Sequence, residues 1–292
     1  MSKNRICLLC GETDYETILS YDEPDQYENV VSVSPKGYFR KWVKCTKCGL
    51  LYSIFSRDEF ILDQIYTEAY RDPNAAWRDG TTEQIFNKVI HLPFSESETK
   101  FRIHWIKSNI KDLYKYGIKK RNSSPLNMLD IGGGNAVFAY EFQDEDWKVF
   151  IVDANASGEF IENKLGIPFV RDYYRPNLFD QKFDLISLIF VLEHLRNPRL
   201  ILREICNDLD SESLLYIEVP DANAFEIKKK EDDIFNSCHL YMFSPTTLAL
   251  LLYQCGFEIM CIKRVRTVRD HLAIMLLAKK DLDRGKSNFR TI

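Results

Sequence analysis

Residues 127–136 combine an acid with three consecutive glycines, in the order Asn-Met-Leu-Asp-Ile-Gly-Gly-Gly-Asn-Ala. The apolar residues before Asp130 predict a short strand, and helix-forming residues begin at Val137. Glycine at such a turn permits positive φ and lets backbone N–H groups approach a ligand closely. Ligands of open α/β sheets bind where strands end and helices begin. We therefore expect a ligand site here, with Asp130 placed to bind a cationic group.

The glycine turn could serve NAD, S-adenosylmethionine or no cofactor, and its surroundings favour S-adenosylmethionine. An NAD fingerprint needs a third glycine where this chain has Val137, and it normally has an aliphatic residue at the position of Asp130. A second acid, Asp153, ends the next expected strand, at the distance of about 20 residues typical of an acid that binds ribose hydroxyls. Both cofactors carry a ribose, so Asp153 does not discriminate between them.

Four of the eight cysteines form two Cys-x-x-Cys-Gly units, with ligands at Cys7, Cys10, Cys45 and Cys48. Four thiolates suit tetrahedral Zn²⁺, and each following glycine frees the backbone to donate N–H bonds to sulfur. Such an ion has no open position for a substrate or a water, so we expect the zinc to be structural. A redox pair and chance spacing are the alternatives. We interpret the other cysteines as small buried hydrophobic residues: Cys206, Cys238, Cys255 and Cys261.

From residue 126 onward, alternating strand and helix patterns predict an α/β fold with a parallel sheet covered by helices on both faces. Near the end, Ser244-Pro245 begins a helix that Gly256 stops. The last two strands follow with only a short turn between them, and this makes them antiparallel, because a parallel crossover needs a dozen or more residues. The expected strands are 126–130, 148–153, 168–171, 184–190, 214–219, 257–265 and 272–278, with a helix at 199–209.

Two capping-box patterns, Ser56-x-x-Glu59 and Ser95-x-x-Glu98, predict helices that begin near Phe60 and Phe101. Residues 71–93, between these helices, are rich in turn-forming residues and are interpreted as a loop or lid. We therefore divide the chain into a zinc-binding module (1–55), a helical linker and lid (56–120) and a cofactor-binding domain (121–292).

Three ordered motifs resemble the class I S-adenosylmethionine-dependent methyltransferases, in particular the families labelled type 11, 12 and 23. They are Met-Leu-Asp-Ile-Gly-Gly-Gly-Asn-Ala, Ile-Val-Asp153, and Phe-Asp-Leu-Ile-Ser-Leu-Ile-Phe-Val-Leu-Glu-His-Leu from Phe183 to Leu195. The resemblance covers about residues 126–280. It implies a Rossmann-like seven-stranded sheet with an antiparallel last strand, and S-adenosylmethionine as the cofactor.

The same resemblance implies a set of cofactor-binding residues. Asp130 and the backbone of Gly132, Gly133 and Gly134 would hold the methionine part, and Asp153, with Ala154 beside it, would bind the ribose. Asp172 and Tyr173 would contact the adenine, and Phe190 completes the set at the end of the fourth strand. The family's turn ends in glycine where this chain has Ala136.

A second resemblance concerns the acceptor of the methyl group. The zinc-ribbon-like N-terminal module, followed by Cys-Gly-Leu-Leu-Tyr, and the segment His239-Leu-Tyr-Met-Phe-Ser-Pro are similar to bacterial enzymes that methylate deoxysugars or surface-polysaccharide sugars. This resemblance implies a hydroxyl of a sugar, a sugar nucleotide or a polysaccharide precursor as the acceptor.

A sugar hydroxyl must lose its proton as it attacks the methyl group, and histidine is the usual base near neutral pH. We favour His239, after the fifth strand, and place His194, after the fourth strand, second. Glu193 could bind the substrate or orient His194. The alternative is that these residues only position the backbone or pack against the cofactor.

Composition predicts a cytoplasmic protein with no nucleic-acid partner, and the second resemblance implies a small-molecule substrate. The formal charge of −4 offers no general attraction for nucleic acid, and the acidic loop between the cysteine pairs would repel phosphate. We interpret the small basic cluster Arg40, Lys41, Lys44 and Lys47 as a solvated hairpin face. No signal-peptide core and no apolar run of about 18 residues is present. A zinc-containing RNA methyltransferase and a non-catalytic S-adenosylmethionine-binding protein remain as alternatives.

Overall fold

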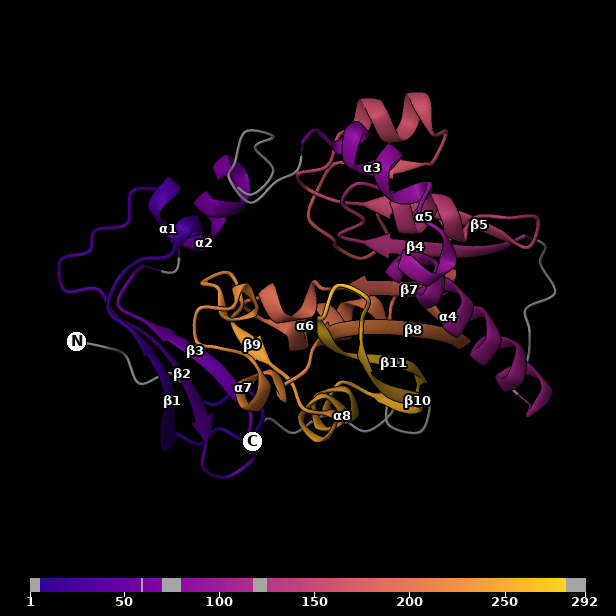
Figure 1. Cartoon of the computed structure of the whole chain (residues 1–292). Helices are drawn as coiled ribbons and strands as arrows, with labels where there is room; N and C mark the ends of the chain where they lie inside the picture. Colours follow the sequence, from indigo (N-terminus) through magenta and orange to yellow (C-terminus); the bar gives the residue numbers. More distant parts are fainter. Residues whose placement is uncertain (1–5, 59, 70–79, 118–124, 282–292) are drawn as a thin grey trace.

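The computed structural model describes residues 6–58, 60–69, 80–117 and 125–281. Its larger sheet has seven strands in the order β10-β11-β8-β7-β4-β5-β6 (Figure 1). Only β11 runs antiparallel to its neighbours, β8 and β10, so the expected α/β fold with an antiparallel last strand is confirmed. The strands are β4 (Leu126–Ile131), β5 (Trp147–Val152), β6 (Phe169–Val170), β7 (Phe183–Ile189), β8 (Leu209–Pro220), β10 (Phe257–Arg266) and β11 (Leu272–Lys280).

Helices cover both faces of this sheet because successive strand residues point to opposite sides. Leu129 and Ile131 belong to a core that contains Leu202 of α6 (Pro198–Ile205) and Leu248 of α8 (Pro245–Gln254). Met128, between them, belongs to a second core with residues of α4 (Glu98–Lys115), α5 (Val137–Phe142) and the π-helix η3 (Glu159–Lys164). The central strands are therefore buried on both faces, which accounts for their nearly continuous apolar sequences.

The N-terminal residues form a second, antiparallel sheet that the rest of the chain completes. Its strands are β1 (Tyr15–Tyr21), β2 (Arg40–Cys45), β3 (Leu51–Phe55) and β9 (Tyr241–Met242), in that order, with the helix α1 (Gln26–Val30) between β1 and β2. Leu51 pairs with Met242, and β9 lies beside β3 in Figure 1. Cys7 and Leu9 share a hydrophobic core with α6 and α8. The cysteine-bearing module is thus packed onto the larger sheet's helices.

The helix predicted near Phe60 begins there, but its predicted cap is wrong, and the helix predicted near Phe101 begins earlier, at Glu98. The hydroxyl of Ser56 bonds to the backbone of Phe39 instead of capping a helix, and α2 (Phe60–Gln64) begins beyond it; Glu59 lies outside the described residues. Ser95 lies in the 3₁₀ helix η2 (Phe94–Glu96), and α4 is capped by Ser97, which accepts a bond from the Lys100 N–H. At α4, both Ser95 and Ser97 could supply the capping oxygen, and Ser97 does. At α2, the Phe60 N–H donates to Oδ1 of Asp58 instead.

The predicted loop at 71–93 was wrong over its second part. Residues Thr82–Ile90 form the helix α3, which begins with a capping box between Thr81 and Gln84. Phe86 anchors it by edge-to-face contacts with Tyr140 and Phe160. Residues 71–79 lie outside the described residues. The predicted helix at 199–209 is shorter than expected, since it ends at Ile205 and Leu209 already begins β8.

The remaining short elements connect the sheets. They are the π-helix η1 (Ile65–Ala69), the 3₁₀ helices η4 (Leu192–His194) and η5 (Asp233–Phe235), and the helix α7 (Ala224–Ile227). Within the described ranges, no helix combines the length and the apolar character needed to cross a membrane.

Candidate active site

The turn after β4 has the shape of a cradle that side chains would fill. Gly132 and Gly134 have positive φ angles of 76° and 60°. A Cβ atom at Gly132 would lie 2.6 Å from Cγ2 of Val191, and one at Gly133 would lie 2.9 Å from Oδ2 of Asp130. Real Cβ atoms do not approach other atoms so closely. The glycines are therefore required by the backbone conformation and by the nearness of Asp130 and Val191.

Asp130 is a buried acid at the floor of this cradle. Its side chain is 2% exposed, and Ser187 Oγ donates a hydrogen bond of 2.6 Å to Oδ1. Burial raises the pKa of Asp130 to about 7, and the charge of Asp153 raises it further, against the lowering effect of the Ser187 bond. A cationic group beside Asp130 would favour the carboxylate and lower this pKa. The site therefore suits a ligand that brings positive charge.

Asp153 follows β5 and is bound to the same turn. Its Oδ2 accepts a bond of 2.9 Å from the Gly134 N–H, and Oδ1 accepts one of 2.8 Å from the Asn155 N–H. These two bonds orient the carboxylate at the carboxyl end of β5. Ala154 lies between Asp153 and Asn155 in the chain. Because β4 and β5 are parallel neighbours, Asp153 and Asp130 lie at the same edge of the sheet.

The other expected cofactor residues also follow parallel strands at this edge. Asp172 and Tyr173 come after β6; the Asp172 carboxylate accepts from the Tyr173 N–H, and the Tyr173 ring is exposed. Phe190 comes directly after β7 and has a φ of 52°, which is strained for a bulky residue. Ala136 has a φ of 61° where the family has glycine. Strained backbone of this kind persists where surrounding contacts enforce it, and it clusters at functional sites.

Glu193, His194 and His239 come together beside the glycine turn. A donor atom of each lies within 4.8 Å of a donor atom of each of the other two. The imidazole rings of His194 and His239 are 4.7 Å apart between centroids, and Nε2 of His194 lies 3.7 Å from Oε1 of Glu193. The ring of Tyr66, in η1, packs edge-on against His194. Val191, which touches Gly132, precedes Glu193 by two residues, so these groups lie next to the cradle.

Burial determines the charge state of this trio. Removal from water lowers the pKa of His194 to about 3 and that of His239 to about 4, so both imidazoles are neutral at pH 7. The same effect raises the pKa of Glu193 to about 8. Within the described part of the chain, neither carboxyl oxygen of Glu193 has a hydrogen-bond partner.

Two hydrogen bonds determine which nitrogen of each ring carries the proton. Nδ1 of His194 lies 3.0 Å from the carbonyl oxygen of Cys238, and Nδ1 of His239 lies 2.7 Å from that of Ile234. A carbonyl oxygen can only accept, so Nδ1 must be the protonated nitrogen in each neutral ring. The lone pair is therefore on Nε2 in both histidines.

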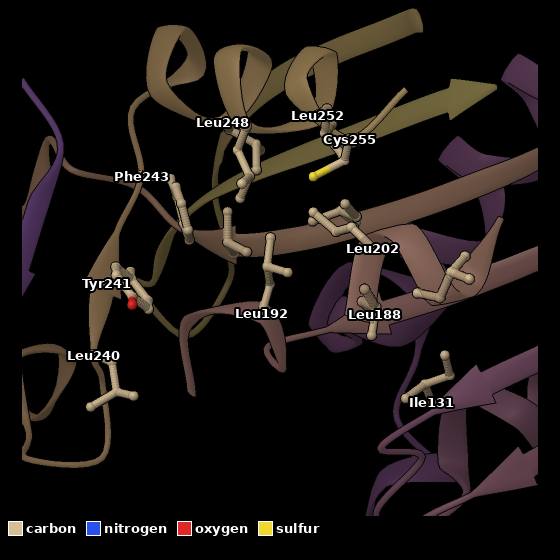
Figure 2. Packing of buried hydrophobic residues seen from close by; sticks show 14 of the residues in the cluster. Ile131, Leu188, Leu192, Leu202, Leu240, Tyr241, Phe243, Leu248, Leu252 and Cys255 are labelled. Carbon is tan, nitrogen blue, oxygen red and sulfur yellow. The ribbon is translucent and has the colours of Figure 1, made fainter. Parts of the chain in front are cut away.

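Leu192 fixes the position of Glu193 and His194. It is fully buried, and Figure 2 shows it between Leu188 and Ile131 on one side and Leu240 and Tyr241 on the other. The Leu240 N–H donates a bond of 2.8 Å to the carbonyl of Glu193, and this bond joins the segment of His239 to that of Glu193. Tyr241 is also buried in this core, so packing is its observed role.

The N-terminal sheet supports the His239 segment from the other side. The Ser53 N–H donates to the carbonyl of Leu240 (2.9 Å), and Ser53 Oγ donates to the carbonyl of His239 (3.1 Å). Asp25 accepts bonds from the N–H and hydroxyl of Ser237. The module that carries the cysteines therefore also holds a wall of the site.

Arg40 corrects the interpretation of the basic cluster. Its side chain is 2% exposed, donates to the carbonyl of Phe235 and lies 3.7 Å from Asp25. It is thus a buried structural cation rather than part of a solvated hairpin face. Its carbonyl partner, Phe235, comes from a distant part of the chain, which the local sequence pattern could not indicate.

The four N-terminal cysteines converge as the sequence predicted. Sγ of Cys7 lies 3.5 Å from Sγ of Cys48, and Sγ of Cys10 lies 3.5 Å from Sγ of Cys45. Four sulfurs at about 2.3 Å from one tetrahedral zinc are separated by about 3.8 Å, whereas sulfurs of a disulfide are about 2.05 Å apart. All four thiols lie within 4.8 Å of one another, so they could hold one metal ion.

Sequence reasoning missed the buried polar residues behind the site. Arg102 of α4 makes a two-point ion pair with Glu218 of β8, and the Tyr216 hydroxyl also donates to Glu218. Ser187, the partner of Asp130, lies in β7. The signal that could have found Ser187 and Glu218 is a polar residue inside an otherwise apolar strand. Arg102 gives no such signal, because charged residues are normal in an amphipathic helix.

Comparison with known proteins agrees with this geometry. A family model described as a methyltransferase domain matches residues 101–262, more than half of the chain. Among solved structures, the chain is similar to 1,6-didemethyltoxoflavin-N1-methyltransferase of Burkholderia thailandensis (17% identity, 68% of this chain and 84% of that chain, TM-score 0.49). It is also similar to magnesium protoporphyrin IX methyltransferase of Synechocystis PCC 6803 (16% identity, 68% and 94%, TM-score 0.47). No curated protein matched. The chain belongs to the methyltransferase domain family, and it is a class I S-adenosylmethionine-dependent methyltransferase.

Proposed function

We propose that this methyltransferase acts on a small molecule and methylates a hydroxyl of a sugar, a sugar nucleotide or a surface-polysaccharide precursor. The observation that carries the proposal is the pair of neutral imidazoles, His194 and His239, with their lone pairs on Nε2 beside the glycine cradle. A hydroxyl must be deprotonated during attack, and such groups serve that step. The sugar class rests on the resemblance of the cysteine module and of the segment that follows His239.

In this proposal the edge of the sheet binds S-adenosylmethionine, which supplies a methyl group on a positively charged sulfur. Asp130 binds the ammonium of the methionine part, with the backbone of Gly132, Gly133 and Gly134 around it. Asp153 and Ala154 bind the ribose. Asp172 and Tyr173 contact the adenine, and Phe190 lines the site. The buried carboxyl of Asp130 and the glycine cradle both fit a compact cationic amino-acid group.

The acceptor oxygen is activated by the histidines. His239 takes the proton on Nε2 as the oxygen forms its bond to the methyl carbon, and the sulfur leaves with the electron pair of its former bond. His194 is the second candidate for this role, and Glu193 orients it. The enzyme's main contribution is alignment, since reacting atoms must be held at about 3–3.5 Å.

We further propose that Cys7, Cys10, Cys45 and Cys48 bind a structural zinc ion, so that residues 1–55 form a zinc-binding module. Their mutual distances are close to those of four sulfurs around one ion. With four protein ligands, the ion has no chemical step to perform. The ion would affect the site only by stabilising residues 1–55, because β3 of this module pairs with β9 and supports the His239 segment.

The test is release of S-adenosylhomocysteine with a panel of sugar nucleotides, with unmodified RNA as a second acceptor class. We expect turnover with a sugar nucleotide, and we expect His239→Asn to lower kcat by about 100-fold while cofactor affinity stays unchanged. The matched control is His91→Asn, which replaces the exposed histidine at the C-terminal cap of α3. Turnover on RNA alone, or full activity of His239→Asn, would contradict the proposal.

A further inference from the structure

We propose that Glu193, His194 and His239 form a second metal site, which binds a divalent first-row transition ion such as Mn²⁺, Fe²⁺ or Zn²⁺. The inference begins with the convergence of three ligand types that such ions use: two imidazole nitrogens and one carboxylate oxygen. This site is distinct from the four-cysteine site, because it contains no thiolate ligand and leaves coordination positions for other molecules.

The first supporting observation is the buried carboxyl of Glu193. The side chain is fully buried, and in the described ranges both of its oxygens are without a hydrogen-bond donor. A buried carboxyl is almost always hydrogen-bonded, paired or bound to a metal. Its nearest polar neighbour among the trio, Nε2 of His194, carries a lone pair and cannot donate a bond in the neutral ring. A divalent cation would bind these oxygens and keep the carboxylate ionised.

The second observation is the orientation of the two imidazoles. Histidines that bind metals almost always donate their other ring N–H to a carboxylate or a backbone carbonyl, which fixes the tautomer and the ring plane. His194 and His239 both do this, through the carbonyls of Cys238 and Ile234. Hydrogen bonds at Nδ1 therefore already orient both rings, and Nε2 of each ring is the nitrogen that would bind the ion.

The three ligands are also held by rigid surroundings. Glu193 and His194 follow the buried Leu192, and the segments of Glu193 and His239 are joined by the Leu240 N–H bond. Ligand atoms around one ion lie about 3–3.5 Å apart when the bonds are about 2.1 Å long. The three ligand atoms lie within 4.8 Å of one another, so small rotations of the side chains would bring them onto one ion.

The ligand set also indicates the class of ion. Mg²⁺ and Ca²⁺ prefer oxygen ligands, and two of the three protein ligands here are nitrogens. Ions later in the first row accept imidazole and carboxylate together, and two histidines with one carboxylate leave positions open on one side. No redox step follows from this arrangement, because methyl transfer requires none.

This inference keeps the proposed acceptor but replaces the role proposed for His239 as base, and its mechanistic part rests on the proposed function. An acceptor hydroxyl bound to the ion would lose its proton more easily, since a bound divalent ion lowers the pKa of an oxygen ligand. The proton goes to solvent, the oxygen forms its bond to the methyl carbon, and the sulfur leaves with its electron pair. In this form the ion replaces an imidazole as the activating group, because a lone pair bound to a metal cannot take a proton.

The direct test is Mn²⁺ binding to the full-length protein that holds one zinc ion per chain, measured by the decrease in the electron-paramagnetic-resonance signal of free Mn²⁺. Mn²⁺ is a poor partner for thiolates, so the cysteine site does not compete. We expect one bound Mn²⁺ per chain in the wild type. Binding should be at least tenfold weaker in Glu193→Gln and in His239→Asn, and unchanged in His91→Asn.

Two outcomes would overturn the metal site: absence of Mn²⁺ binding and of a second zinc in the wild type, or equal binding by Glu193→Gln. Thermal unfolding of each variant without added Mn²⁺ shows whether it is folded, and Glu193→Gln is nearly isosteric. The binding assay needs neither cofactor nor acceptor. Mn²⁺ binding without turnover on any sugar nucleotide would therefore contradict the proposed function alone, and metal-independent turnover without binding would contradict the metal site alone.

Discussion

If Asp130 binds the ammonium of the cofactor as proposed, its burial predicts that the affinity for the cofactor depends on pH. Its pKa is raised from 3.8 to about 7, chiefly by removal from water. If the ammonium of the cofactor binds only the carboxylate, the apparent affinity scales with the ionised fraction of Asp130. That fraction is about 3% at about pH 5.5 and about 75% at about pH 7.5 for a pKa near 7. We therefore expect binding of S-adenosylhomocysteine to strengthen about 25-fold across this interval.

Isothermal titration calorimetry with S-adenosylhomocysteine at several pH values measures this dependence. Ser187→Ala removes a hydrogen bond that lowers the pKa of Asp130, so it should move the midpoint to a higher pH. Asp130→Asn should bind at least tenfold more weakly at about pH 7.5, which is a loss of about 1.4 kcal/mol, and it should show no such dependence on pH. A wild-type affinity that is flat over this interval would refute the reasoning.

The pH dependence of folding stability provides a second test of the raised pKa of Asp130. A carboxyl whose pKa is higher in the folded protein than in the unfolded chain favours folding most when it is protonated. Its contribution is therefore complete below about pH 4, and it is lost as the pH rises through about 7. Thermal unfolding of the cofactor-free protein should show a loss of stability over this range that Asp130→Asn lacks.

Three further predictions concern the supports of the site. Gly132→Ala and Gly166→Ala both place a side chain at positive φ and should each cost about 1–2 kcal/mol of unfolding free energy. Only Gly132→Ala meets a neighbour, Cγ2 of Val191, so only it should also weaken cofactor binding in calorimetry; equal binding by both variants would contradict this. Arg102→Met should cost about 3–5 kcal/mol in chemical denaturation because it leaves Glu218 buried without its ion partner. Adding Glu218→Leu should recover much of that loss, and a double variant as unstable as the single one would oppose this account. If the four cysteines bind zinc as proposed, its removal by a chelator should lower the melting temperature and expose the Leu240 and Ser53 amides to hydrogen exchange, because β3 loses support. Unchanged protection would show that the metal does not support the site.

The sequence predicted the glycine turn at the carboxyl edge of the sheet because the elements of this turn are adjacent in the chain. A strand that ends in Asp130, glycines that permit positive φ and a helix at Val137 follow one another in the chain, and this order is itself the physical signal. The antiparallel pairing at the end of the sheet could also be predicted from the sequence, since a short turn can join two adjacent strands only in antiparallel orientation. The capping residues and the helix α3 were missed because several nearby serines and threonines compete to start a helix.

The amino-acid sequence by itself determined the class I sheet, the two cysteine pairs and the candidates around Asp130, Glu193 and His239. Only the tertiary structure decided how these groups act on one another. Glu193 and His239 are distant in the chain and meet because β9 joins the N-terminal sheet while Leu240 bonds to Glu193. Burial then set the charge of each group, and two backbone carbonyls set the tautomers. Desolvation and tautomer choice depend on neighbours brought together by folding, so no local pattern of residues could have specified them.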